Sequence, residues 1–196
     1  MAVEEPNYTL VQSDPDFELR RYAPYLVAET RVTGDFDSVG NQAFRILAGY
    51  IFGDNRSQTK LEMTAPVTQT TAEGTGERLE MTAPVIQRSD GDGTSGTYVL
   101  SFVMPAGYRL DTLPVPTDPR VTLREEPSRL MAVRRYSGRW TRSNYLEQES
   151  RLLRGIRQAG LQPIGTPRYA RYNPPFTPWF LRRNEVMVEV AEPSAP

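Results

Sequence analysis

The stretch Leu61-Glu62-Met63-Thr64-Ala65-Pro66-Val67 returns, letter for letter, as Leu79-Glu80-Met81-Thr82-Ala83-Pro84-Val85. Residues 68–78, between the copies, place glycines within a run of small polar residues, which is typical of a turn. Two apolar runs joined by such a loop predict a β-hairpin. Each run contains a proline, which cannot donate to a sheet ladder, so each should lie at a strand end, an edge or a bulge. Met63 and Met81 then either fill gaps in the core or line a shared cavity.

The predicted hairpin lies between two longer segments that are similar to each other. Residues 17–36 align without a gap on residues 121–140, a shift of 121 − 17 = 104 positions. Six aligned pairs are identical: Leu19 and Leu123, Arg20 and Arg124, Leu26 and Leu130, Ala28 and Ala132, Arg31 and Arg135, Gly34 and Gly138. Both segments lead into a helical pattern at the same place. The sequence therefore predicts a duplicated unit, strands then helix then strands, repeated about a pseudo-two-fold axis.

The composition excludes several classes of function. The 196 residues carry a formal net charge of −1, so no general basic field attracts nucleic acid. Cysteine and histidine are absent, which removes disulfides, thiolate catalysis, the commonest metal ligand and the usual general base. No apolar run is long enough to span a bilayer, and residues 1–5 do not resemble a signal peptide. We therefore expect a cytoplasmic protein with no transmembrane segment and no nucleic-acid partner.

The order of predicted elements follows the duplication. Residues 1–16 are polar and predict a flexible N-terminal arm, and residues 192–196 a short tail. The two repeats span about residues 17–104 and 121–191, within one domain of residues 17–191. Strands are expected at 17–22, 25–33, 98–104, 121–136, 166–172 and 185–190, and helices at 38–51 and 140–159. The proline-rich residues 105–119 have the composition of a connector between the halves.

The first helix shows two faces. At about 100° per residue, one arc is apolar and should pack on the sheet; it contains Phe36, Val39, Ala43, Ile46, Leu47 and Tyr50. Phe44 and Ala48 fall outside this arc, beside Asn41 and Arg45. This second face combines an aromatic ring and a small residue with an amide and a guanidinium beside them, a combination that suits the binding of a ligand. The alternative is a wide apolar face covered by a neighbouring loop.

A second candidate surface is the loop at residues 172–184, Tyr-Asn-Pro-Pro-Phe-Thr-Pro-Trp-Phe-Leu-Arg-Arg-Asn. Its prolines lower the entropy cost of holding one shape. Exposed aromatic rings beside arginines suit a flat anionic ligand or a partner protein. The alternative is that the rings cover the open end of the sheet.

These motifs together resemble the SOUL heme-binding protein family. The resemblance rests on the paired Met-Thr-Ala-Pro-Val segments, on Tyr172-Asn173-Pro174-Pro175 and on Arg182-Arg183-Asn184-Glu185-Val186, and it covers about residues 15–191. It implies an α+β fold: two pseudo-symmetric βαββ repeats forming a distorted antiparallel barrel-like sheet, with two helices packed on it. It also implies tetrapyrrole binding in an apolar groove beside the first helix. Carried over by position, the groove would involve Asn41, Phe44, Arg45, Ala48, Tyr172, Phe176 and Thr177.

A histidine ligand for heme iron, which some family members are thought to use, is absent from this chain. We therefore expect heme, or metal-free porphyrin, to be held mainly by apolar contact, with Arg45 and Arg182 or Arg183 pairing with the propionates. The expected role is that of a carrier, buffer or sensor rather than an enzyme. Two alternatives stay open. One is a small-molecule-binding or enzymatic domain of the gyrase-inhibitor-like type, with Glu149 as acid or base; Glu149 could equally be a rim residue paired to an arginine. The other is a protein-interaction module that uses residues 172–184.

Overall fold

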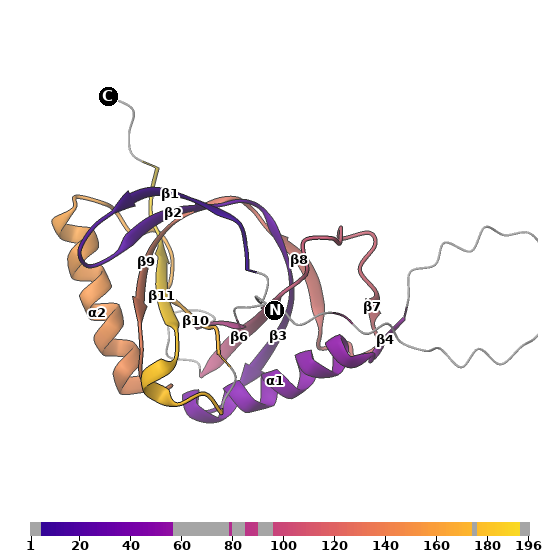
Figure 1. Ribbon diagram of the computed structural model, residues 1–196. Helices are drawn as coiled ribbons and strands as arrows, with labels where there is room; N and C mark the ends of the chain where they lie inside the picture. The colour runs from indigo at the N-terminus through magenta and orange to yellow at the C-terminus, as the bar shows by residue number, and fades with distance from the viewer. Residues whose placement is uncertain (1–4, 57–78, 80–84, 90–95, 174–175, 193–196) are drawn as a thin grey trace, which may run out of the picture.

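Nine antiparallel strands form one sheet that curls into a half-barrel, and two helices pack on its outer face (Figure 1). The computed structural model describes residues 5–56, 79, 85–89, 96–173 and 176–192. The strands of this sheet are β1 (Tyr8–Ser13), β2 (Glu18–Tyr22), β3 (Tyr25–Thr33), β5 (Val85–Ser89), β6 (Thr97–Val103), β8 (Thr122–Glu126), β9 (Arg129–Tyr136), β10 (Arg168–Arg171) and β11 (Asn184–Glu189). Two short strands, β4 (Asn55–Arg56) and β7 (Val115–Pro116), pair separately. The helices are α1 (Phe36–Phe52), α2 (Arg142–Gln158) and the short 3-10 helix η1 (Trp179–Leu181).

The strand order shows the internal duplication directly. Along the sheet the order is β1-β2-β9-β11-β10-β5-β6-β3-β8. Exchanging β2, β3, β5 and β6 for their counterparts β8, β9, β10 and β11 reproduces the order from β2 to β8 in reverse. A pseudo-two-fold axis therefore passes between β5 and β10, and the predicted repeat is confirmed. Each half is strand, strand, helix, strand, strand, which is one strand more than a βαββ unit.

A proline marks the equivalent corner in each half. Pro24 separates β2 from β3, and Pro127 separates β8 from β9. Because proline has no N–H to donate, the ladder can end where the chain must bend. Each corner carries the chain between opposite ends of the strand order, which draws those ends towards each other (Figure 1). The Ser128 hydroxyl donates to the Tyr22 carbonyl at 2.8 Å and so joins the two corners.

Side chains along the strands alternate between the helices and the inside of the curl. Leu26 and Ala28 of β3 pack beneath α1, and their repeat counterparts Leu130 and Ala132 of β9 pack beneath α2. The concave side holds a third apolar cluster, which includes Met187 of β11. The outer face therefore buries the two helices, and the concave face is a separate environment. The helices lie within two residues of their predicted ends.

The N-terminal segment differs from the prediction of a flexible arm over residues 1–16. Tyr8–Ser13 form β1, which pairs with β2 along the edge of the sheet. All six residues of β1 are exposed, so the strand has no buried face and no alternation of apolar residues predicts it from the sequence. It forms because β2 would otherwise leave its backbone N–H and C=O groups unpaired at an edge.

The duplicated seven-residue stretch lies almost wholly outside the described residues. Of its two copies, only Leu79 and Val85 are described. Leu79 is buried and donates its N–H to the Ile51 carbonyl at 2.9 Å, while Val85 opens β5. The hairpin between the copies and the roles of Met63 and Met81 therefore stay predictions.

Candidate ligand-binding site

Three of the four residues on the predicted ligand face of α1 are open to solvent. Asn41, Phe44 and Arg45 are exposed within little more than one helical turn. Among the described residues, Arg45 forms no ion pair. Its side chain also borders a polar cavity of about 570 Å³ that includes Asp118 and Arg120. This face thus offers an amide, an aromatic ring and a guanidinium to a ligand.

The buried arc of α1 is wider than predicted. The expected residues Val39, Ala43, Ile46, Leu47 and Tyr50 are buried, and so are Gly40 and Ile51; the side chain of Phe36 lies outside the described part. Phe44 packs its ring on Phe102 of β6, with centroids 5.4 Å apart, and 36% of the residue remains exposed. Ala48 is only 9% exposed. The expectation that a planar ligand could approach Ala48 is therefore not met in this conformation, because the apolar face of the helix extends to it.

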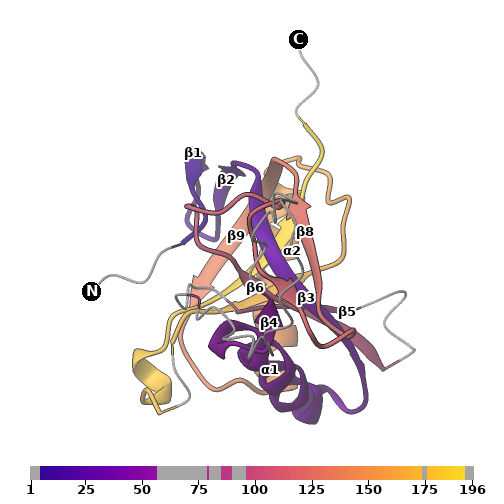
Figure 2. The same cartoon turned by 90° about the vertical axis from the view of Figure 1, so that its right-hand side faces the viewer.

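The loop at residues 172–184 carries the most exposed apolar side chains of the described chain. Phe176 is 87% exposed, and Trp179, Phe180 and Leu181 of η1 are each at least half exposed. The yellow turn that bears η1 projects from the body of the domain (Figure 2). These rings therefore do not cover the open end of the sheet, which was the alternative interpretation. They form a surface that a ligand or partner can reach.

Backbone and side-chain contacts hold this loop in shape. Arg182 donates from Nε to the Thr177 carbonyl at 2.8 Å, which closes the turn around η1. Gly138 donates its N–H to the Trp179 carbonyl at 3.0 Å, which ties the loop to the segment before α2. The exposed rings thus lie on a turn that is already held by hydrogen bonds. Binding there would therefore carry a small entropy cost for ordering the backbone.

Arg171, the last residue of β10, connects the loop with both helices. Its Nε donates to the Tyr145 hydroxyl of α2 at 2.8 Å, and its Nη2 donates to Gln87 Oε1 at 2.9 Å. On the other side it lies against α1, where a Cβ added to Gly40 would come within 3.3 Å of Arg171 Nη1. Gly40 therefore allows a close approach between the N-terminal half of α1 and the start of the loop. We call this contact between Arg171 and α1 the seam. Because Phe44 is one turn from Gly40, the ligand face of α1 begins beside the seam.

Trp140 extends the seam to the far end of the loop. Its indole N–H donates to Asn184 Oδ1 at 2.7 Å. The guanidiniums of Arg182 and Arg171 lie over its ring, 4.1 Å and 5.0 Å from the centroid. Cationic groups and aromatic rings therefore run from α1 to the loop. Such a surface can bind a flat molecule that carries negative charge at its edge.

The comparison with protein families identifies the domain. The model described as SOUL heme-binding protein matches residues 3–78 and 71–189, well over half of the sequence. The chain belongs to the SOUL heme-binding protein family. Heme-binding protein 2 of Mus musculus is 27% identical over 201 residues, covering 96% of this chain and 90% of that protein. Heme-binding protein 2 of Homo sapiens is 28% identical over 164 residues, covering 81% of this chain and 72% of that protein.

Solved structures share the fold of this SOUL domain at low identity. The C-terminal domain of EcmrR superposes with a TM-score of 0.61 at 12% identity, covering 94% of this chain and 98% of that chain. A hydrolase from Listeria innocua superposes with a TM-score of 0.59 at 11% identity, covering 97% and 94%. At such identities the likeness concerns the fold alone.

The side chains of the SOUL domain are better suited to contact a tetrapyrrole macrocycle than to ligate its iron. The chain has no imidazole and no thiolate, and the described part of the candidate surface offers oxygen donors such as Asn41 and Thr177. Phe44 and Phe176 suit the face of a macrocycle, and arginines suit its carboxylates. Among the described residues, no three acidic side chains gather so as to hold a metal ion, and no helix is long and apolar enough to cross a membrane.

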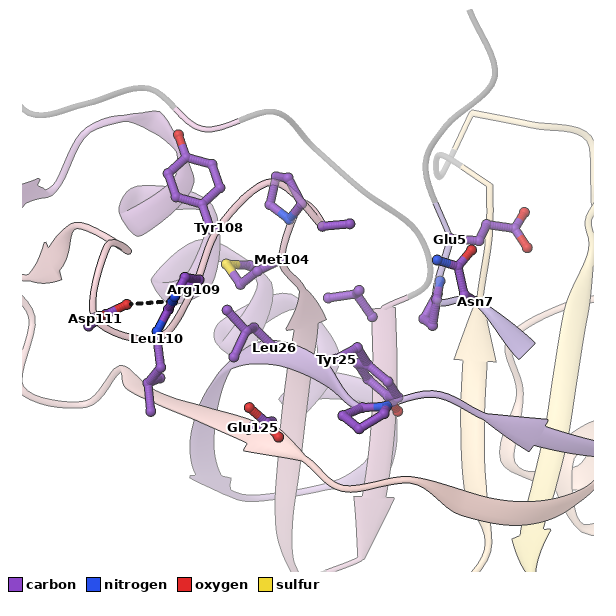
Figure 3. Close-up of a pocket in the computed structure, with 15 residues that line it drawn as sticks. Glu5, Asn7, Tyr25, Leu26, Met104, Tyr108, Arg109, Leu110, Asp111 and Glu125 are labelled. Carbon is purple, nitrogen blue, oxygen red and sulfur yellow. Dashed lines mark ion pairs between the residues drawn. The ribbon is translucent and has the colours of Figure 1, made fainter. Parts of the chain in front are cut away.

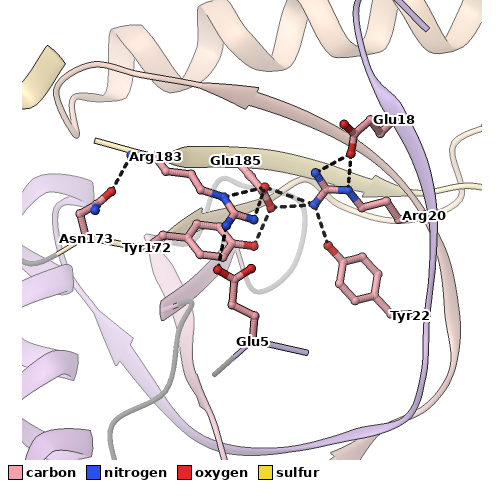
Figure 4. A network of polar contacts seen from close by, with 8 residues as sticks. All are labelled: Glu5, Glu18, Arg20, Tyr22, Tyr172, Asn173, Arg183 and Glu185. Atoms are coloured by element: carbon pink, nitrogen blue, oxygen red, sulfur yellow. Dashed lines mark hydrogen bonds and ion pairs between the residues drawn. The ribbon is translucent and has the colours of Figure 1, made fainter. Parts of the chain in front are cut away.

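Tyr172 lies apart from the other predicted site residues. Its ring packs against the concave apolar cluster, on the face of the SOUL sheet opposite the helices. The phenol donates to Glu185 Oε2 at 2.6 Å, and the Arg183 guanidinium lies 3.8 Å from the ring centroid (Figure 4). Tyr172 therefore anchors the base of the loop from inside the curl and does not share the outer surface with Asn41 and Arg45.

The carboxylate of Glu185 organises this concave network (Figure 4). It is fully buried and accepts hydrogen bonds from Arg20 and Arg183 as well as from Tyr172. Burial raises the pKa of the Tyr172 phenol, and the charge of Glu185 raises it further. Burial alone would lower the pKa of Arg20 and Arg183, but the charge of Glu185, together with their hydrogen bonds and other nearby charges, outweighs burial and raises both. The phenol therefore donates as a neutral group, and both guanidiniums stay charged.

Glu149 of α2 does not pair with an arginine among the described residues. It is half-buried and accepts a hydrogen bond from the Tyr169 hydroxyl. Burial raises the pKa of Tyr169, and its hydrogen bond to Glu149 acts in the same direction. The two groups form a helix-to-sheet contact on the outer face of the SOUL sheet.

Sequence reasoning missed the residues that join the two predicted surfaces, Arg171 and Trp140. Arg171 ends a strand and Trp140 precedes a helix, so neither belongs to a periodic pattern. The signal that could have found Trp140 is its alignment with Phe36, because both close the duplicated segment as aromatic residues before a helix.

Proposed function

We propose that the protein binds heme or a related tetrapyrrole on the outer surface between α1 and the loop at residues 172–184. The observation that carries this proposal is that the exposed Phe44 and Arg45 of α1 and the exposed Phe176 of the loop are linked by the half-buried Arg171, Trp140 and Arg182. Membership of the SOUL family supports it. The expected role is a carrier, buffer or sensor in the cytoplasm, without catalysis by the protein.

Each residue of this surface has a distinct part in the proposal. Phe44 and Phe176 contact the faces of the macrocycle and exclude water from them. Arg45 and Arg182 pair with its carboxylates. Asn41 and Thr177 supply polar contacts at the edge, and Tyr172 holds the loop from the concave side. Ala48 is only 9% exposed and is assigned no contact.

The tetrapyrrole is cargo in this proposal, and its affinity comes from the macrocycle and its carboxylates. Iron ligation is left to tyrosine, methionine or a weaker oxygen donor, because histidine and cysteine are absent from the chain. Metal-free protoporphyrin should therefore bind within about tenfold of hemin, a difference of roughly 1.4 kcal/mol. Bound ferric heme should lack the spectrum of a low-spin bis-nitrogen or thiolate complex.

Titration of the full chain with hemin and with protoporphyrin tests the proposal. Arg45→Glu should weaken binding of both, and should weaken binding of protoporphyrin dimethyl ester much less, since the ester has no carboxylates. The matched control is Arg154→Glu, an exposed arginine on α2 outside this surface. Equal loss for the free acid and the ester would contradict the charge pairing. A preference for hemin of several hundredfold would contradict an affinity that comes from the macrocycle and its carboxylates.

A protein partner on the same loop is the second candidate. The observation that favours it is that Trp179, Phe180 and Leu181 expose apolar area beyond the residues assigned to the macrocycle. Replacing Phe180 with serine should leave hemin affinity unchanged if this area serves a protein, and should reduce it if the ring covers the ligand.

A further inference from the structure

A cavity of about 580 Å³ opens at the rim of the half-barrel, where β3 begins and β6 ends (Figure 3). Three segments that are distant in sequence enclose it: residues 5–7, residues 24–26 and residues 103–111. Glu125 of β8, which pairs with Leu26 in the sheet, completes the lining. None of the residues assigned to the tetrapyrrole surface takes part. The volume lies in the range of about 300–1,000 Å³ that is usual for small-molecule sites.

The floor of the cavity is apolar. Leu26, Val103 and Met104 are buried at its base, and Tyr25 and Tyr108 contribute rings (Figure 3). Rings and thioether side chains of this kind bind the hydrophobic body of a ligand. An organic molecule rather than a bare ion therefore fits the cavity.

The wall formed by residues 105–111 is built by local hydrogen bonds. Tyr108 donates its N–H to the Pro105 carbonyl at 3.2 Å, and Thr112 donates its N–H to the Arg109 carbonyl at 3.0 Å. The Arg109 N–H donates in turn to the Thr112 hydroxyl at 2.9 Å. The segment predicted to be a connector is therefore a folded wall, and the cavity exists before a ligand enters.

Acidic groups dominate the rim of the cavity. The lining contains three carboxylates, Glu5, Asp111 and Glu125, against one guanidinium, Arg109. Glu5 pairs with Arg183 at 2.7 Å, and Asp111 pairs with Arg109 at 3.3 Å. Glu125 is exposed and forms no ion pair with a described residue. The carboxylate of Glu125 is thus available to bind a ligand. Its negative charge is opposite to the charge of the arginines beside α1.

We propose that this cavity is a second ligand site, which takes a small organic cation: an amine or quaternary ammonium carried on an apolar body. The body packs on Leu26, Val103 and Met104. The cationic head lies near Glu125 at the rim. The same carboxylates disfavour tetrapyrrole propionates, so the two sites select ligands of opposite charge.

Three ligands that share one apolar body but carry a positive, a neutral or a negative head group test this site. Phenylbutylamine, phenylbutanol and phenylbutyrate are titrated separately into the full ¹⁵N-labelled chain at pH 7, with binding followed by amide chemical shifts. The amine should bind about fivefold more tightly than the alcohol, and the carboxylate more weakly than both, as expected for a single charge contact near the surface. Shifts should be largest at the amides of residues 25–26, 103–104 and 106–111, since Pro24 and Pro105 have no N–H.

Two variants and a control locate the binding. Ala106→Trp fills the cavity from an exposed position and should abolish binding of all three ligands. Glu125→Gln should remove the preference for the amine and leave the alcohol unchanged. Glu147→Gln removes the same charge from an exposed position on α2 and should change nothing.

The outcome is independent of tetrapyrrole binding. Hemin affinity should be unchanged in Ala106→Trp and Glu125→Gln, whereas Arg45→Glu should reduce hemin affinity and leave the amine unaffected. Absence of binding by all three ligands would overturn the proposed site. So would tightest binding of the carboxylate, or amine binding that persists in Ala106→Trp.

Discussion

Replacing Phe176 with alanine is the sharpest test of the tetrapyrrole surface. The residue is 87% exposed, so the substitution removes little packing from the folded protein. We expect a change in the free energy of unfolding within about 0.5 kcal/mol, as for other surface substitutions. A change in ligand affinity would therefore report on contact with the ligand and not on damage to the fold.

The size of the effect follows from the exposed area. A phenylalanine side chain offers about 200 Å² for burial, of which roughly 170 Å² is open at 87% exposure. A flat ligand on one face of the ring would cover about half of this, or roughly 85 Å². At about 25 cal/mol per Å² the lost contact is worth about 2 kcal/mol, which is roughly a 30-fold rise in the hemin Kd.

The assay compares hemin titrations and thermal melts of wild type, Phe176→Ala and Leu146→Ala. Leu146 is a half-exposed apolar residue of α2, outside residues 172–184, so its variant controls for the general loss of apolar surface. A hemin Kd within twofold of wild type in a stably folded Phe176→Ala protein would refute the assignment of this loop to the ligand.

Two further predictions follow from burial and charge. Ala48→Trp should lower the melting temperature, because insertion of a large ring at a position only 9% exposed costs about 1–3 kcal/mol; an unchanged melting temperature with lost hemin binding would instead mean that Ala48 lines an open groove. Burial alone would raise the pKa of Glu126, but hydrogen bonding to Arg124 and the charges of Arg168, Arg124 and Arg129 together outweigh it and hold the pKa below its ordinary 4.5. This carboxylate therefore stabilises the fold above pH 4.5, and its contribution is lost as pH falls through the lower folded-state pKa. Glu126→Gln should be less stable than wild type in urea unfolding at pH 7, with the deficit shrinking in acid; a deficit that is constant with pH would contradict the linkage.

The prediction of the fold depended on positions that keep the same role in both halves. Leu26 and Ala28 match Leu130 and Ala132 under the 104-residue shift, and all four are buried beneath the helices. Apolar alternation is a local property of a strand, so it can be read without knowing which strands pair. β1 could not be found in this way, since it carries no buried face and exists only because β2 offers it a free edge.

The candidate site was predictable only in part. The exposed face of α1 follows from helical period, and the exposure of Phe176 agrees with its place in a proline-rich loop. Tyr172 is the first residue of that loop but turns its side chain into the concave network, because strand alternation continues from β10. Ala48 is buried because the covered arc of the helix is wider than its apolar pattern suggests.

By itself, the sequence determined the duplication, the two helices, their buried stripes and the absence of imidazole and thiolate ligands, since these depend on residue identity and local periodicity. Only the tertiary structure decided that Glu185 would be buried between Arg20 and Arg183, that Arg171 would join α1 to the loop, and that residues 5–7, 24–26 and 103–111 would enclose a cavity. Each of these features brings together side chains from distant parts of the chain. Their proximity is fixed by which strands pair and how the sheet curls, and no local pattern encodes either.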